Sequence, residues 1–144
     1  MRSRMDKVQR PGYSRRNRME HAVPPWRLSA GIVALVLDLA HVFRIAREIH
    51  GPMVGSDWPE PAKAVCSVVW HAATAMMALG GLALIAAGLM PDRALELAAL
   101  PVALFLSAAA LFLFYGRRRL GSVRVLPQWT AFLAISALAL VGLA

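Results

Sequence analysis

Long apolar runs separated by short polar segments dominate the chain after residue 27. One of them covers residues 62–90, and it contains no charged residue between Lys63 and Asp92. A helix needs about 20 apolar residues to cross the hydrocarbon core of a bilayer. This run is therefore long enough to span a membrane with some tilt. Three similar runs predict further membrane helices at residues 28–48, 94–115 and 125–144.

Together the four runs predict an all-α bundle of transmembrane helices over residues 28–144, preceded by a disordered basic tail over residues 1–27. The tail is rich in arginine and has almost no apolar periodicity, which is typical of disorder. Small residues recur four positions apart in three of the predicted spans, a spacing that lets membrane helices approach closely. These pairs are Ala83 with Ala87, Ala103 with Ser107, and Thr130 with Ala134.

The composition supports the membrane class. Hydrophobic residues make up 58% of the chain and the mean hydropathy is +0.55, which is too apolar for an ordinary soluble domain. A net charge of +8 would suggest nucleic acid as the partner of a soluble protein. Here the basic residues flank apolar runs, so topology and lipid contact explain them better, and we expect no nucleic-acid partner. The expected partners are the lipid bilayer and other membrane subunits, and the expected location is a bacterial inner membrane, with several passes.

The charge pattern leaves the orientation open. With four spans, the tail and the Pro91 turn place nine Lys and Arg residues on one side, and the loops on the other side hold seven. The positive-inside rule does not decide between nine and seven. Translation from Met19 would leave two against seven and would place the first and third loops in the cytoplasm, the arrangement that we favour. Alternatively, the first apolar run lies at the interface and three helices span. The basic turn of the third loop is a topology signal that also contacts anionic lipid; it contains Arg117, Arg118, Arg119 and Arg124.

Ionisable residues inside the first two spans are the candidate functional residues. Asp38, His41 and Glu48 share one face of the first predicted helix, and His71 lies in the second. A charged residue near the bilayer centre costs about 2.5–3.5 kcal/mol on insertion scales, so Asp38 should face protein rather than lipid. Gly51-Pro52, Pro59 and Pro61 predict a loop over residues 50–61, which leaves His50 in a solvated segment. A hairpin with this loop centred near Ser56 would set His41 beside His71, with both about 10–12 Å below one membrane surface.

Four interpretations of these residues remain open. His41 and His71, completed by Asp38 or Glu48, would offer nitrogen and oxygen ligands to zinc, iron or copper. The same two histidines would serve as axial ligands of a haem. Asp38 with the histidines would form a pathway for protons or a small solute. Lastly, the histidines would only hold two helices in register through hydrogen bonds.

Motifs of catalysis are lacking in the sequence, which has no glycine-rich phosphate loop, no HExxH and no credible Ser/His/Asp set. A single cysteine, Cys66, excludes an intramolecular disulfide. We therefore predict a non-enzymatic accessory protein or complex subunit that acts through helix packing. The alternatives are a metal- or haem-binding redox protein that uses His41 and His71, and a proton or solute pathway past Asp38.

Three features together resemble a group of small four-helix integral membrane proteins of bacteria, whose function is unknown. They are Trp70-His71 in the second span, a histidine in the first, and the basic turn that leads to Pro127-Gln128-Trp129. The resemblance covers residues 30–144. In those proteins a Gly-Glu pair closely follows the first-span histidine, whereas here Glu48 follows Ala46-Arg47. The resemblance implies a four-helix membrane architecture and no particular activity.

Overall fold

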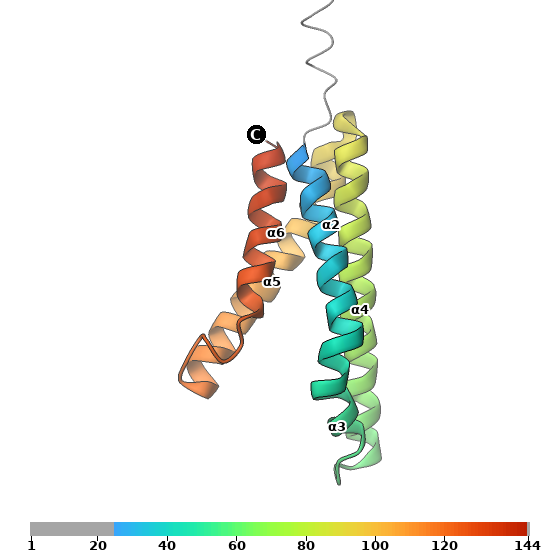
Figure 1. Ribbon diagram of the computed structural model, residues 1–144, viewed down its shortest axis with the longest axis vertical. Coiled ribbons are helices and arrows are strands. Elements are labelled where there is room, and N and C mark those ends of the chain that lie inside the picture. Colours follow the sequence, from blue (N-terminus) through green and yellow to red (C-terminus); the bar gives the residue numbers. More distant parts are fainter. Residues whose placement is uncertain (1–24, 144) are drawn as a thin grey trace, which may run out of the picture.

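A computed structural model describes residues 25–143, and every regular element in this range is a helix (Figure 1). The elements are α2 (Pro25–Ala40), the π-helix η1 (His41–His50), α3 (Gly51–Val54), α4 (Glu60–Leu89), the short 3₁₀ turn η2 (Pro91–Arg93), α5 (Ala94–Leu120) and α6 (Gln128–Leu143). The predicted all-α class is confirmed for this part of the chain. The predicted basic tail lies outside the described residues except for its last three, which begin α2.

The first long helix extends further than its predicted end at Glu48. Elements α2, η1 and α3 form one continuous helix of 30 residues, Pro25–Val54. The predicted start of the loop at His50 is therefore wrong, because the helix continues to Val54. Gly51-Pro52 does not break the helix because the π-helical segment before it shifts the hydrogen bonds. The N–H of Gly51 bonds the carbonyl of Ala46, five residues back. Local π adjustments of this kind accommodate a proline inside a membrane helix.

Three helices are long and apolar enough to cross a membrane: Pro25–Val54, Glu60–Leu89 and Pro91–Leu120, each of 30 residues. A helix of that length spans about 45 Å, whereas the hydrocarbon core of a bilayer is about 30 Å thick. The fourth helix, α6, has only 16 residues and spans about 24 Å. The structure therefore confirms three of the four predicted spans by length and composition.

The helices form a bundle that is closed at one end only. Helix α2 packs between α4 and α6, and α5 packs against α4 and α6 (Figure 1). The core lies in the half of the bundle near Pro25 and Leu143, where Phe132 stacks between Phe105 and Phe112 at ring-centroid distances of 6.0 and 5.7 Å. Its fully buried side chains include Ala30, Ala34, Leu84, Ala87, Ile135 and Ala139.

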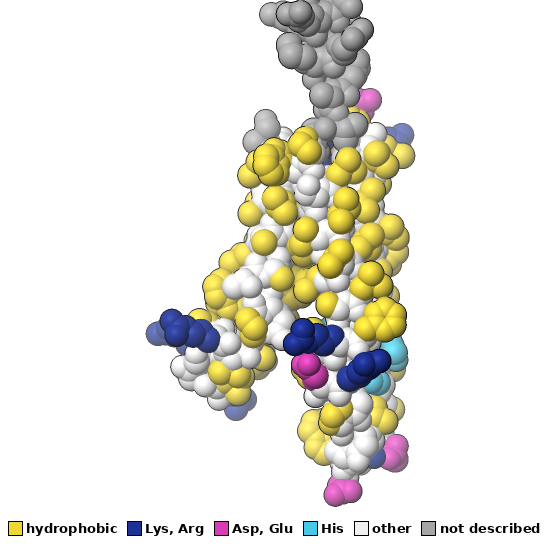
Figure 2. All heavy atoms as spheres, in the orientation of Figure 1, with side chains coloured by type: hydrophobic (Ala, Val, Ile, Leu, Met, Phe, Trp, Pro, Cys, Tyr) yellow, Lys and Arg dark blue, Asp and Glu magenta, His cyan; other side chains and the backbone are white. Residues whose placement is uncertain are grey.

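At the other end the helical hairpin of α2, η1, α3 and α4 diverges from α5 and α6 and reaches further (Figure 1). No residue of η1 or α3 is buried. Figure 2 shows apolar side chains covering the closed half on this face, while most charged and histidine side chains gather where the arms have separated. We call residues 41–71 of this hairpin the projecting hairpin.

Glycine, rather than the predicted pairs of small residues, allows the closest helix approach. A Cβ added to Gly31 of α2 would lie 2.7 Å from the carbonyl oxygen of Gly81 of α4, and one added to Gly81 would lie 3.2 Å from that of Gly31. Of the predicted small residues only Ala87 is buried; both members of the α5 pair and both members of the α6 pair are exposed. The predicted pairs on α5 and α6 therefore lie outside the buried faces of these helices, and the buried face of α5 uses other small residues, such as Ala98 and Ala109, together with Pro101 and Phe105.

Candidate functional site

Three histidines and one tryptophan gather on the projecting hairpin. The imidazole of His41 stacks on the indole of Trp70, with ring centroids 4.0 Å apart and planes 16° from parallel. The ring of His50 lies 5.3 Å from that of Trp70 and 5.7 Å from that of His71, which it meets edge to face at 64°. We call these four residues the His–Trp cluster. It joins the two ends of η1 to two adjacent residues of α4.

The π-helix is what brings both ends of η1 to this cluster. In an α-helix, with about 3.6 residues per turn, positions 41 and 50 would point in opposite directions. The i to i+5 bonding of a π-helix widens each turn and returns His50 to the face of His41. Both rings then contact the same indole. π-Helical turns are rare in proteins and are frequent at functional sites.

The histidine contact therefore differs from the predicted one. The ring that meets His71 is that of His50, and His41 stacks on the neighbouring Trp70 instead. The predicted register assumed an α-helix that ends at Glu48, and it left His50 in a solvated loop. In the structure His50 is half-buried, and its Nε2 lies 3.1 Å from the Oγ of Ser67.

Asp38 lies on the interior face of α2, in line with Ala30 and Ala34, and is only 8% exposed. The prediction that it faces protein rather than lipid is confirmed. Its Oδ1 is buried and has no hydrogen-bond partner among residues 25–143, and the same holds for Nε2 of His41. These two residues are three positions apart on one helical face, as the predicted pathway requires.

Glu48 lies away from the other predicted ligands and pairs with Arg44. Its carboxylate accepts a hydrogen bond from Nε of Arg44 at 3.4 Å, and both side chains are largely exposed. Exposed ion pairs of this kind contribute about 0.2–1 kcal/mol. Within residues 25–143, no three His, Cys, Asp or Glu side chains come close enough to hold a metal ion. The predicted metal site, His41 and His71 completed by Asp38 or Glu48, is therefore not assembled among the described residues.

The basic turn lies at the end of α5, where all four predicted topology residues are exposed: Arg117, Arg118, Arg119 and Arg124. Gly121 ends the helix in the left-handed region, with φ of 68°, and the N–H of Ser122 bonds the carbonyl of Gly116 at 3.1 Å. The indole N–H of Trp129 donates to the carbonyl of Val123 at 3.0 Å. These contacts fix the turn, and the start of α6 beside it.

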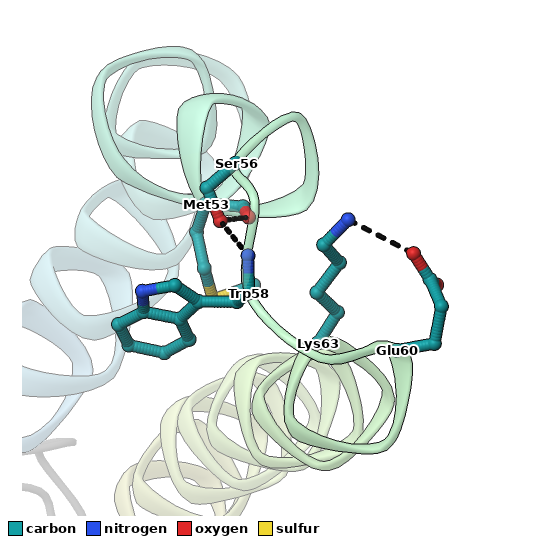
Figure 3. A network of polar contacts seen from close by, with 5 residues as sticks. All are labelled: Met53, Ser56, Trp58, Glu60 and Lys63. Carbon is teal, nitrogen blue, oxygen red and sulfur yellow. Dashed lines mark hydrogen bonds and ion pairs between the residues drawn. The ribbon is translucent and has the colours of Figure 1, made fainter.

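The tip of the projecting hairpin has the polar contacts of an aqueous loop (Figure 3). The hydroxyl of Ser56 donates to the carbonyl of Met53 at 2.6 Å and accepts from the backbone N–H of Trp58 at 3.4 Å. Nζ of Lys63 lies 2.9 Å from the carboxylate of Glu60. This polarity fits a position outside the hydrocarbon core.

The chain matches no protein-family model, no curated protein and no solved structure in the comparisons made with each. Its own geometry is therefore the basis for a functional proposal. Two features of that geometry stand out: the His–Trp cluster, and the exposed surface of the projecting hairpin.

Proposed function

We propose that this chain is a non-enzymatic, multi-pass protein of a bacterial inner membrane and acts as an accessory protein or subunit of a membrane complex. The closed half of the bundle anchors it, and the projecting hairpin contacts the partner. All four helices cross the membrane in this proposal. Helix α6 does so by local thinning of the bilayer, with Trp129 at the interface.

Counted from Met19, the start that we favour, the charge pattern supports an orientation in which the open end of the bundle faces the cytoplasm. Among the described residues, the closed end carries two basic residues, Arg27 and Arg93. The open end carries seven, namely Arg44, Arg47, Lys63, Arg117, Arg118, Arg119 and Arg124. Cytoplasmic loops of membrane proteins are enriched in Lys and Arg.

The dimensions of α4 support a hairpin that projects from the membrane. The polar turn at Asp92 and Arg93 marks one membrane surface. From Leu89 at that surface, about 32 Å of helix reach Val68, which is slightly more than the thickness of the hydrocarbon core. The part of α4 before Val68 and the facing part of the first helix then lie in the interfacial region and beyond it.

The observation that carries the proposal is an apolar face on this projecting part. Val65, Val68 and Val69 are 63%, 68% and 62% exposed, and their spacing places them on one side of α4. No other helix of the described chain covers the projecting hairpin, because α5 and α6 have diverged from it (Figure 1). Apolar patches at the edge of the hydrocarbon core mark contact sites for proteins or membranes.

Photocrosslinking in native membranes tests the proposal. A photoreactive amino acid replaces Val68, and the matched control replaces Leu79, which is 67% exposed on the same helix but lies in the closed half. We expect the probe at position 68 to form an adduct with one discrete protein and the probe at position 79 to form lipid adducts. Lipid adducts alone at both positions would overturn the proposal.

A further inference from the structure

We propose that His50 and His71 bind a divalent late transition-metal ion, with Zn²⁺ as the reference case. This inference is independent of the proposed subunit function, because it concerns the histidine face of the hairpin and not its valine face. It also differs from the site predicted from the sequence, since His41 is not a ligand.

The spacing of the two rings fits one shared ion. Zn²⁺ binds imidazole nitrogens at about 2.0–2.1 Å in a tetrahedral arrangement, which holds two ring centroids about 5–6 Å apart. The centroids of His50 and His71 are 5.7 Å apart.

A hydrogen bond prepares His50 as a ligand. Its Nε2 lies 3.1 Å from the hydroxyl oxygen of Ser67. In the tautomer that donates from Nε2 to this oxygen, the lone pair of Nδ1 is free to bind the ion. Metal-binding histidines almost always donate their other ring N–H to such an acceptor, which fixes the tautomer and the ring orientation. Ser67 is thus a positioning residue, and it lies one helical turn from His71 on the same face of α4.

The surroundings of the two histidines differ: His50 is held by its neighbours, and His71 is accessible. His50 is half-buried against Trp70, whereas His71 is exposed. With no third His, Cys, Asp or Glu in reach within residues 25–143, water completes the shell. Structural zinc sites have four protein ligands, so a site with two is open and exchanges its ion readily.

Calorimetry with the full chain in lipid nanodiscs tests the site, with ZnCl₂ as the titrant. We expect one Zn²⁺ per chain, and a dissociation constant that rises by about tenfold or more in His50→Gln and in His71→Gln. The matched control is His41→Gln, which changes a ring of the same cluster that stacks on Trp70 and should leave the affinity unchanged. Ser67→Ala should weaken binding by about 10–100-fold, and Ser67→Thr should restore it.

Two results would overturn the proposal: no Zn²⁺ binding by the wild-type chain, or equal losses in His41→Gln and His71→Gln. A spectroscopic measurement keeps the test independent of folding defects. With Cu²⁺ as the probe, the electron paramagnetic resonance spectrum of the wild-type chain should show coupling to two imidazole nitrogens, and His71→Gln should show coupling to one. An unchanged spectrum in His71→Gln would also refute the site.

Discussion

The indole of Trp70 lies face to face with the imidazole of His41, with ring centroids 4.0 Å apart and planes 16° from parallel. An aromatic pair of this kind contributes about 0.5–1.5 kcal/mol beyond the burial of its area. The same indole contacts His50 at the other end of η1. Trp70 therefore stabilises the one segment of the first helix that departs from α-helical bonding.

Replacement of Trp70 should loosen this segment selectively. In Trp70→Ala we expect the amides of η1 to exchange hydrogen about tenfold faster, since a loss of about 1.4 kcal/mol corresponds to that factor. Hydrogen exchange followed by mass spectrometry in nanodiscs measures it. The control is Trp58→Ala, which removes a tryptophan that is 54% exposed in the hairpin loop. Equal protection of η1 in both variants would show that Trp70 does not hold the π-helix.

Arg27 and Gly142 join the start of α2 to the end of α6. Nε of Arg27 donates to the carbonyl of Gly142 at 2.6 Å, where a cation also interacts favourably with the C-terminal end of the helix dipole. A Cβ added to Gly142 would collide with the Arg27 side chain and lie 3.1 Å from its backbone nitrogen. Gly142→Ala should therefore lower the free energy of unfolding more in the wild-type background than in the Arg27→Ala background, where the colliding side chain is absent.

A double-mutant cycle measures this dependence. We expect a coupling free energy of about 0.5–3 kcal/mol between the two substitutions, as for residues in direct contact. Unfolding by steric trapping in bicelles supplies the four free energies of unfolding. Strict additivity would show that the two residues do not interact in the membrane.

The crossing of α2 and α4 should tolerate no side chain at Gly31. In Gly31→Val the added atoms would meet the backbone of Gly81 and Ile85, for which even a single Cβ lies at 2.7 and 2.8 Å. Overpacking of this kind costs about 1–3 kcal/mol. The matched control is Gly55→Ala in the hairpin tip, where the added Cβ meets no atom closer than 3.6 Å. Thermal unfolding in detergent compares the two variants, and equal midpoints would contradict the close crossing.

Cysteine labelling in intact cells tests the orientation. In a background that carries Cys66→Ala, the cysteine of Arg118→Cys should react with a membrane-impermeant maleimide only after the membrane is permeabilised. The cysteine of Asp92→Cys, at the closed end, should react in intact cells. Labelling of position 118 in intact cells would place the open end outside the cytoplasm.

The apolar runs predicted most of the helices because long uncharged segments have few alternatives in a bilayer. The predicted starts at residues 62 and 94 lie within two residues of the observed starts of α4 and α5. The burial of Asp38 followed from the cost of charge in hydrocarbon, and it was predicted correctly. These features depend on composition and solvent alone, so the sequence carries them directly.

The features that the sequence did not predict depend on contacts between helices. Gly51-Pro52 is a helix breaker in isolation, and only the π-helical hydrogen bonds of η1 carry the helix through it. His50 reaches Trp70 and His71 for the same reason. Glycines were not recognised as the close-contact residues because alanine is so common in these spans that a four-residue spacing of small residues is a weak signal. Gly31 and Gly81 are far apart in the sequence and meet only where α2 crosses α4.

The depth of the projecting hairpin in the membrane tests most directly whether the closed half spans the bilayer and the hairpin projects from it. Spin labels are placed at position 57 in the hairpin tip and at position 79 in the closed half of α4, in a background that carries Cys66→Ala. Their accessibility to oxygen and to a water-soluble nickel chelate is then compared in liposomes. We expect the label at position 79 to be accessible to oxygen and shielded from nickel, as in hydrocarbon, and the label at position 57 to show the reverse. Oxygen-rich, nickel-poor surroundings at both positions would place the hairpin inside the bilayer, and nickel access at position 79 would contradict a membrane-spanning bundle.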